Sequence, residues 1–100
     1  MIAVIAAGER WPDQSLRPAI EDWLGAGAII RSLSGIETPE ATLARLAFTA
    51  AESCLEAITK ESIAGRELID RGFEGDVDIA LEIDSCAATP VLDEGEYRSL

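Results

Sequence analysis

A carboxylate and a guanidinium come directly after a run of apolar residues, in the sequence Gly8-Glu9-Arg10. The apolar run, residues 2–7, is typical of a buried strand, and in open α/β sheets ligands bind beyond the carboxyl ends of the strands. At such a position Glu9 could bind a metal ion and Arg10 an anionic substrate. The alternative is a solvated turn with a surface ion pair, and position alone favours that alternative.

Glu21 and Asp22 are adjacent carboxylates in the first turn of an expected helix. Hard oxygen ligands suit Mg²⁺, and because the chain has no His, any metal bound here would be a hard cation. The alternative is that both carboxylates only compensate the positive end of the helix dipole, which requires no ligand. The sequence leaves the two interpretations equal.

Another helix start, Ser62-Ile63-Ala64-Gly65-Arg66, combines features that suit an anion. Ser62 is a capping hydroxyl, free backbone N–H groups follow it, Gly65 allows a close approach and Arg66 adds a guanidinium. The alternative is an ordinary helix cap followed by a surface arginine, and without further context the ordinary cap is favoured.

The composition argues against several kinds of chemistry and partner. The absence of His removes Ser-His-Asp and Cys-His catalysis and every imidazole-containing metal site. Cys54 and Cys86 form no CxxC pair, so zinc and thioredoxin-type chemistry are not expected, and two thiols without a secretory leader suggest a cytoplasmic protein. A net charge of −11 argues against nucleic acid and anionic membrane surfaces, and no apolar run is long enough to span a membrane.

The apolar pattern and the capping residues predict a single unit, residues 1–100, with four helices and two strands. Residues 2–7 are expected to form a strand covered on both faces, and residues 89–92 a short strand before a turn at 93–95. Helices are expected over about residues 18–33, 39–59, 62–72 and 76–83, with Thr38, Ser62 and Asp76 as caps.

Two expectations concern packing. Gly25 and Gly27 lie inside the first expected helix, where glycine weakens the helix but permits close packing against another backbone. The second expected helix carries an apolar stripe, which would place Cys54 in the core. The stripe consists of Leu43, Ala47, Ala50, Cys54 and Ile58.

Two strands do not make an independent sheet, and a strand that is apolar on both faces needs a neighbour at each edge. We therefore expect an α/β fold that is an incomplete portion of a larger layered domain, helix-rich, with an N-terminal buried strand and a short C-terminal strand. The missing strands would come from residues upstream or from another chain. A helical bundle with an apolar N-terminal tail is the alternative.

Several linked motifs resemble the 2-phosphosulfolactate phosphatase family. AAGERWPD at residues 6–13, SLRPAIED at 15–22 and LGAGAII at 24–30 resemble the central region of that family. Further residues of the chain resemble the C-terminal stretch of the family and occur in the same order. They are Ser62-x-x-Gly65-Arg66-x-Leu68, Gly72-Phe73, Asp76, Asp84-Ser85 and Pro90-Val91-Leu92. Asp13-Gln14 departs from the Asp-Gly that usually follows Trp-Pro in the family.

The resemblance implies an α/β, Mg²⁺-dependent phosphatase that hydrolyses 2-phospho-3-sulfolactate to 3-sulfolactate and phosphate, a step of coenzyme M biosynthesis. With it, we expect the metal near Glu9, Glu21 and Asp22. We expect the phosphate or sulfonate of this small phosphorylated sulfonate substrate near Arg10, Ser62, Gly65 and Arg66. The nucleophile is not identified.

Family chains are longer, and their N-terminal half carries an Asp-Val-x-Arg-Ala-Thr/Ser motif that is absent here. The chain is therefore expected to correspond to the C-terminal half, to be inactive alone, and to associate with the missing half or a second copy as a homo-oligomer. The competing interpretation is a non-catalytic truncated or interaction module with acidic helices, since 13 of the 19 acidic residues lie after residue 50.

Overall fold

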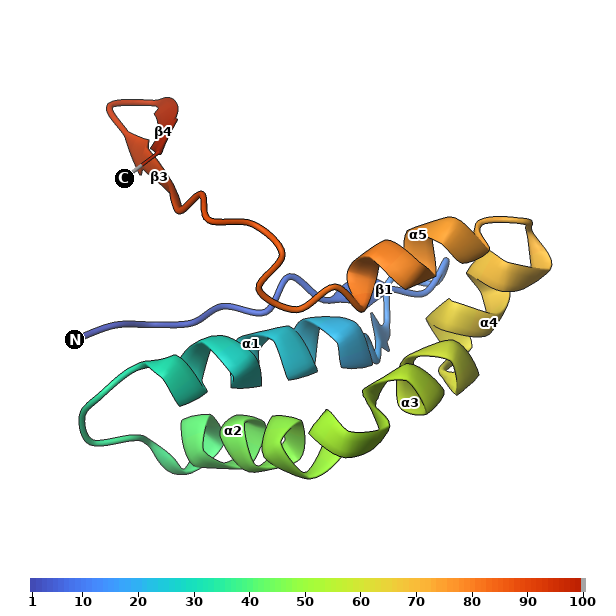
Figure 1. The fold of residues 1–100 in the computed structure, drawn as a ribbon, viewed down its shortest axis with the longest axis horizontal. Coiled ribbons are helices and arrows are strands. Elements are labelled where there is room, and N and C mark those ends of the chain that lie inside the picture. The colour runs from blue at the N-terminus through green and yellow to red at the C-terminus, as the bar shows by residue number, and fades with distance from the viewer. Residues whose placement is uncertain (100) are drawn as a thin grey trace.

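The computed structural model describes residues 1–99, which form helices and two small sheets and confirm the mixed helix-and-strand class. Five α-helices occupy the middle of the chain, and a 3₁₀ helix, η1 (Glu52–Cys54), separates the second from the third (Figure 1). The α-helices are α1 (Ile20–Ser32), α2 (Pro39–Ala51), α3 (Leu55–Glu61), α4 (Ile63–Asp70) and α5 (Glu74–Ala80). The strands are β1 (Glu9–Arg10), β2 (Leu16–Arg17), β3 (Pro90–Asp93) and β4 (Glu96–Ser99).

The core lies between α1 and α2, which run side by side as a helical hairpin (Figure 1). Leu24 of α1 packs on Phe48 and Ala51, and Phe48 is only 1% exposed. Gly27 lets the helices meet because a β-carbon there would overlap the carbonyl oxygen of Ala44. The expected close approach is therefore confirmed at Gly27 but not at Gly25, which has no atom within 4 Å of a β-carbon position.

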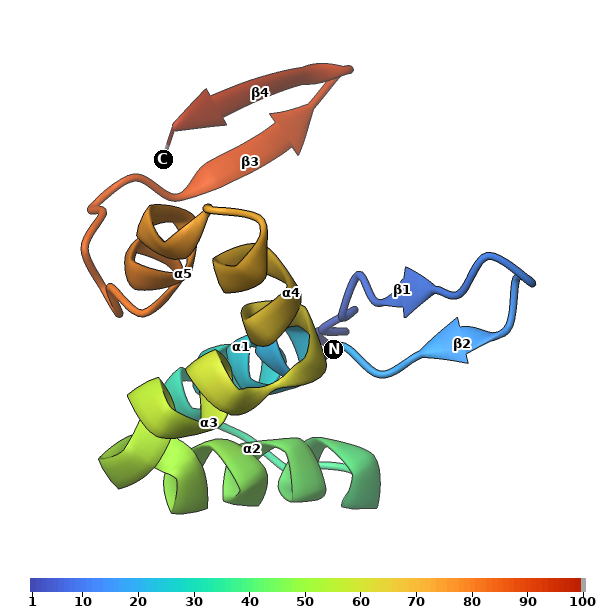
Figure 2. The same cartoon turned by 90° about the vertical axis from the view of Figure 1, so that its right-hand side faces the viewer.

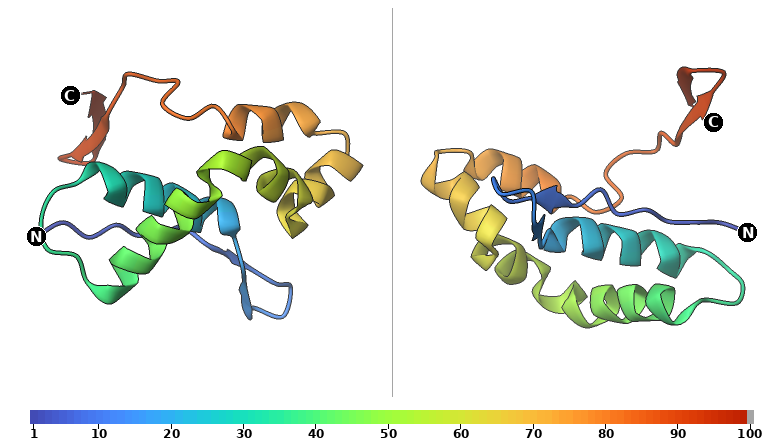
Figure 3. Two further views of the ribbon diagram at one scale, coloured as in Figure 1. Left: turned by 60° about the horizontal axis from the view of Figure 1, so that its bottom comes forward. Right: turned by 180° about the vertical axis from the view of Figure 1, so that it is seen from behind.

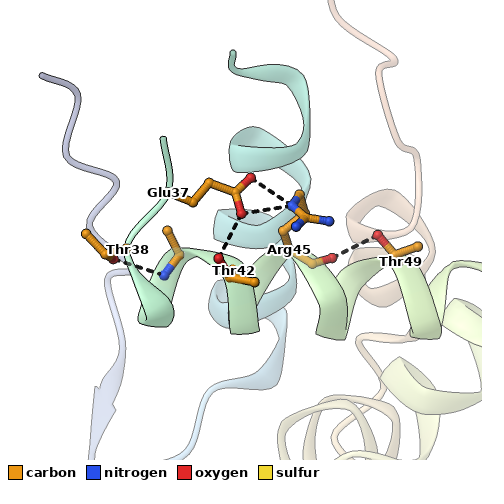
Figure 4. A network of polar contacts seen from close by, with 6 residues as sticks. Glu37, Thr38, Thr42, Arg45 and Thr49 are labelled. Atoms are coloured by element: carbon orange, nitrogen blue, oxygen red, sulfur yellow. Dashed lines mark hydrogen bonds and ion pairs between the residues drawn. The ribbon is translucent and has the colours of Figure 1, made fainter. Parts of the chain in front are cut away.

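The start of α2 is fixed by its own side chains. The Thr38 hydroxyl accepts a hydrogen bond from the Ala41 amide at 3.3 Å, and Pro39 occupies the first turn, as expected for a capped start. The Glu37 carboxylate accepts from Arg45 Nε at 2.7 Å and from the Thr42 hydroxyl at 3.0 Å (Figure 4). The loop before α2 is therefore attached to the second turn of the helix.

The apolar stripe of α2 differs from the expected one by one residue. The buried positions are Ala44, Phe48 and Ala51, whereas Leu43 is 62% exposed and Ala50 and Cys54 are also exposed. Phe48 is the largest fully buried side chain, and it sets the buried face. One residue corresponds to about 100° around a helix, so the buried face only partly overlaps the predicted one. Of the predicted stripe, Ala47 and Ile58 do pack against the core cluster.

The expected helix over 39–59 is interrupted at η1, which was not predicted. Leu55 and Ile58 of the following helix still pack against the Phe48 cluster, so the bend keeps apolar residues on the core side. The placement of Cys54 in the core was wrong, because Cys54 ends η1, where the α-helical spacing of the stripe is interrupted, and its thiol is free and exposed. The remaining helices match the expected ones closely, except that Asp76 lies in the first turn of α5 rather than capping it.

The prediction of a buried strand at residues 2–7 was wrong for the described chain. Residues 1–8 run extended beside α1 in Figures 1 and 3, but they form no strand. Ile2 is 70% exposed and Ile5 88% exposed, and only Val4 in this run is half-buried. A strand needs a hydrogen-bonded neighbour, and residues 1–99 provide none for this segment.

Two antiparallel hairpins project from the helical part of the chain (Figure 2). The expected strand and turn near residue 90 are confirmed as β3 and a turn at Glu94-Gly95, where both residues have positive φ. Its partner β4 and the short β1–β2 hairpin were not predicted. No helix among residues 1–99 is both long enough and apolar enough to cross a membrane.

Candidate functional site

The β1–β2 hairpin carries two of the candidate residues on opposite faces. Glu9 pairs with Arg17 across the hairpin, and Arg10 pairs with Leu16. Successive side chains of a strand point to opposite faces, so Arg10 lies on the face away from Arg17. The Arg10 guanidinium donates to the Gln14 carbonyl at 2.9 Å, within the hairpin itself.

The turn of this hairpin is held by short-range hydrogen bonds. The amide of Gln14, which has φ of 69°, donates to the Trp11 carbonyl at 2.8 Å. The Asp13 carboxylate accepts from both the amide and the hydroxyl of Ser15, and these bonds hold the pKa of Asp13 below its ordinary value. The expected turn at Trp11-Pro12-Asp13 is therefore confirmed, and it serves to close a hairpin.

Arg17 contacts more charged partners than any predicted site residue. Its Nε lies 3.0 Å from Glu9 Oε2, and its Nη2 donates to Glu67 Oε2 at 2.8 Å. The guanidinium also lies 4.7 Å from the centroid of the Trp11 ring. The hydrogen bond to Glu67, followed by the charges of Glu67 and Glu9, raises the pKa of Arg17 above its ordinary value.

Sequence reasoning missed Arg17, although a signal was present. Glu9 and Arg17 lie on either side of a Trp-Pro-Asp turn, so a hairpin prediction would have placed the two charges opposite each other. Glu67 follows Arg66 directly in α4. The Arg17–Glu67 contact therefore brings the hairpin to the helix that carries the predicted anion-binding residues.

Asp22 is tied to the end of the apolar run. One of its oxygens, Oδ2, accepts the Gly8 amide at 2.6 Å, and Gly8 has φ of 70°, which favours glycine. Asp22 is half-buried, whereas the neighbouring Glu21 is exposed and makes no hydrogen bond or ion pair within residues 1–99. The structure thus brings the residue before Glu9 against Asp22, which connects two of the segments that carry predicted metal ligands.

At the start of α4, Ser62 and Gly65 have structural partners. The Ser62 hydroxyl accepts from the Gly65 amide at 3.0 Å and donates to the Thr59 carbonyl at 2.7 Å. Gly65 is buried, and a β-carbon there would overlap the Thr59 carbonyl oxygen. Arg66 is exposed, and its guanidinium makes no hydrogen bond or ion pair within residues 1–99. The cap is confirmed, and the guanidinium that the sequence singled out is available to a ligand.

The carboxylates of residues 1–99 do not assemble a complete metal site. No group of three or more Asp, Glu or Cys side chains in this part of the chain lies close enough to bind one ion. Glu9 is paired with Arg17, and one oxygen of Asp22 is occupied by Gly8. The hard oxygen donors suit Mg²⁺ chemically, but further ligands would have to come from water, substrate or groups outside the described residues.

A hollow of about 550 Å³ lies elsewhere, between η1, α3 and the end of α5. Three carboxylates line it, Glu52, Glu56 and Asp78, and Lys60 pairs with the last two at 3.1 and 2.9 Å. The hydrogen bond to Asp78, with that to Glu56, raises the pKa of Lys60 above its ordinary value. With its cation already paired, this hollow repels a phosphorylated substrate, and so we place the candidate site at the hairpin and α4.

Comparison with known proteins gives one match. A family model described as 2-phosphosulpholactate phosphatase matches residues 2–95. No curated protein and no solved structure matches the chain. The matched range includes the β1–β2 hairpin, α1, and α4 with its cap Ser62, which together carry every candidate site residue.

Proposed function

We propose, from the premise that this chain belongs to the 2-phosphosulpholactate phosphatase family, that it supplies part of the site that hydrolyses 2-phospho-3-sulfolactate to 3-sulfolactate and phosphate. The observation that carries this proposal is the family match over residues 2–95, which covers the hairpin and α4. The phosphatase class follows from the family. The substrate, and with it a role in coenzyme M biosynthesis, is our proposal.

Arg66 is the residue that we propose to bind the phosphate or the sulfonate. Its side chain is exposed and unpaired among residues 1–99, and it lies in the first turn of α4. The amides of Ile63 and Ala64 precede it and have no acceptor in this part of the chain. A guanidinium next to free N–H groups at a helix start suits a tetrahedral anion.

Arg10 is a weaker candidate for the same role, because its guanidinium already donates to the Gln14 carbonyl. Ser62 and Gly65 are proposed to shape the backbone at the helix start, since both have partners within the chain. Their contribution to substrate binding would be indirect: they fix where Arg66 and the free amides lie.

Mg²⁺ dependence is a further part of the proposal. Of the three predicted metal residues, Glu21 and the second oxygen of Asp22 are available to an ion, whereas Glu9 would have to leave Arg17. Mg²⁺ commonly takes one or two carboxylates and completes its shell with water and substrate phosphate. When bound, the ion would neutralise charge on the transferring phosphoryl group.

We propose that residues 1–100 are inactive by themselves. Residues 2–7 expose apolar side chains and unpaired backbone groups, and the carboxylates do not complete a metal site within residues 1–99. Strands from the N-terminal half of the family fold, or from a second copy, would pair with this segment. We also propose a cytoplasmic location, because both cysteines are free thiols.

Phosphate release from 2-phosphosulfolactate tests this function. The assay compares this chain alone with the chain mixed with, or fused to, the N-terminal half of a family member, with Mg²⁺ and with EDTA. We expect turnover only when both halves and Mg²⁺ are present. Robust turnover by the chain alone would disprove the requirement for the other half, and no turnover in any combination would contradict the proposed substrate.

The second candidate is a non-catalytic interaction module. The exposed apolar residues at the N-terminus and the acidic second half of the chain favour it. The two candidates differ in one measurement, because a module gains no phosphatase activity when the other half is supplied.

A further inference from the structure

A single side chain connects the β1–β2 hairpin to α4. Arg17 Nη2 donates to Glu67 Oε2 at 2.8 Å, although 50 residues separate the two in sequence. Within residues 1–99, no other hydrogen bond or ion pair joins the hairpin to that helix. Arg17–Glu67 is therefore the polar link between the two elements in this part of the chain.

Arg17 is also unusually enclosed for a charged residue. Its side chain is 14% exposed, compared with 46% for Glu9 and 51% for Glu67. The Nε atom is buried and near Glu9, but its hydrogen is not directed at an acceptor, so that contact is an attraction between charges. Removing the charge of Arg17 would leave the two carboxylates without the cation that they share.

The geometry of a guanidinium suits this position. It is planar and has several N–H groups, so one side chain can bind Glu67, attract Glu9 and stack on Trp11 at the same time. A lysine ammonium carries the same charge but has no flat face and no second nitrogen. Charge alone would therefore not reproduce all three contacts.

We propose that Arg17 is a positioning residue that holds the hairpin on α4 and thereby fixes Glu9 and Asp22 relative to Arg66. Glu67 is the residue after Arg66, and Glu9 follows Gly8, whose amide binds Asp22. The proposal rests on the proposed function, because the group being positioned is the anion-binding guanidinium. Arg17 itself would not touch the substrate.

The test uses Trp11 as a reporter of the hairpin and inorganic phosphate as the probe of the anion site. In a Trp23→Phe background Trp11 is the only tryptophan, so acrylamide quenching of its fluorescence measures how well the hairpin is docked. Phosphate affinity is measured by titration calorimetry. The variants are Arg17→Lys, Arg17→Gln, Glu67→Gln and the double change Arg17→Gln/Glu67→Gln. Glu61→Gln, an exposed carboxylate without an ion pair among residues 1–99, is the matched control.

We expect Glu67→Gln to raise Trp11 quenching, although the Trp11 ring stacks on Arg17, and to weaken phosphate binding. Removing a carboxylate beside Arg66 would by charge alone favour an anion, so weaker binding reports the lost placement of the hairpin. The double variant should be no worse than Arg17→Gln, because both changes break one linkage. Arg17→Lys should bind phosphate more weakly than the parent although it keeps the charge. Glu61→Gln should match the parent in both quenching and phosphate affinity.

Unchanged Trp11 quenching in Glu67→Gln would overturn the linkage, and additive losses of affinity in the double variant would overturn the positioning role. If the parent binds no phosphate, the anion site of the proposed function fails instead. In that case the quenching measurement still decides whether Arg17 holds the hairpin.

Discussion

The α-carbon of Gly27 in α1 lies against the backbone of Ala44 in α2, so that a β-carbon on Gly27 would overlap the Ala44 carbonyl oxygen. The same β-carbon would be 2.9 Å from the Phe48 β-carbon, closer than real β-carbons approach other atoms. The two helices therefore pack at a distance that only glycine permits at this position. The nearby Gly25, with no neighbour within 4 Å, provides a natural comparison.

Gly27→Ala should destabilise the protein by roughly 1–3 kcal/mol, because the helices must separate to admit one methyl group. Gly25→Ala should instead stabilise it by about 0.5–1 kcal/mol, since alanine is the better helix former and has open space there. Thermal unfolding followed by circular dichroism measures both. Equal effects of the two substitutions would contradict the packing in this structure.

The second prediction concerns how substitutions on the buried and exposed faces of α2 change the stability. Phe48→Ala should cost about 3–5 kcal/mol, which is a large part of the total stability of a small domain. Leu43→Ala should change stability by less than about 0.5 kcal/mol, since Leu43 is mostly exposed. Urea denaturation of both variants at one protein concentration compares them. If Leu43→Ala proved the more damaging, the face predicted from the sequence would be the buried one after all.

The helices could be predicted because their signals are local. Thr38 with Pro39 and Ser62 with Gly65 are cap and turn residues whose hydrogen bonds stay within a few positions, and both helix starts occur where they were expected. The face of α2 could not be predicted this way. Leu43 and Phe48 are both apolar, and the position of Gly27 in another helix decides which of them is buried.

In the candidate site, too, features set by local sequence could be predicted and contacts between distant residues could not. Asp22 was singled out by its type and its place in a first helical turn, but its contact with the Gly8 amide was not predicted. The ion pair of Arg17 with Glu67 joins residues 50 apart, and no local pattern predicts which of the exposed acids of α4 it meets. Residues 2–7 have a strong apolar pattern, yet they form no strand, because a strand forms only where a hydrogen-bonded neighbour exists. A local pattern cannot show whether that neighbour is present.

The ion pair of Glu37 with Arg45 should make stability depend on pH. The hydrogen bond from Arg45, with a smaller contribution from Thr42, lowers the pKa of Glu37 below its ordinary value of 4.5. A lowered folded-state pKa adds stability that is present above the unfolded value and is lost as the pH falls through the folded value. The melting temperature of the parent should therefore fall relative to that of Glu37→Gln as the pH drops below about 4.5.

The quantity to compare is the difference between the two proteins. Protonation of other carboxylates relieves repulsion in a chain of net charge −11, and this effect is common to both. Melting temperatures measured from neutral pH to about pH 3 should converge at the acid end. A constant difference across that range would show that the Glu37 carboxylate gains nothing from Arg45.

The exposed segment at residues 2–7 predicts self-association of the chain when no other partner is present. Its apolar side chains and unpaired backbone groups can pair with the same segment of a second copy. Ile5→Lys, at a position that is 88% exposed, should shift the chain toward monomer, because the added charges of two copies repel. Sedimentation velocity over a range of concentrations measures this. A parent that is monomeric at high concentration would contradict the prediction.

Arg66 makes the sharpest prediction about activity, because nothing in residues 1–99 pairs with it. In the preparation that shows turnover, Arg66→Lys should lower kcat/KM roughly tenfold or more, which corresponds to the loss of one charge-assisted hydrogen bond of about 1.5–3 kcal/mol. Lysine keeps the charge but cannot bind two oxygens of a phosphate or sulfonate at once. Arg71→Lys, at the other end of the same helix, is the matched control and should leave kcat/KM unchanged.

The melting temperature separates a binding role from a structural one. Since Arg66 is exposed and unpaired in the described chain, its replacement by lysine should leave the melting temperature within the scatter of the control. A fall in kcat/KM without a fall in melting temperature therefore indicates contact with the substrate. If kcat/KM stays within about twofold of the parent, a difference of under 0.5 kcal/mol, Arg66 is only a surface residue and the start of α4 does not bind the anion.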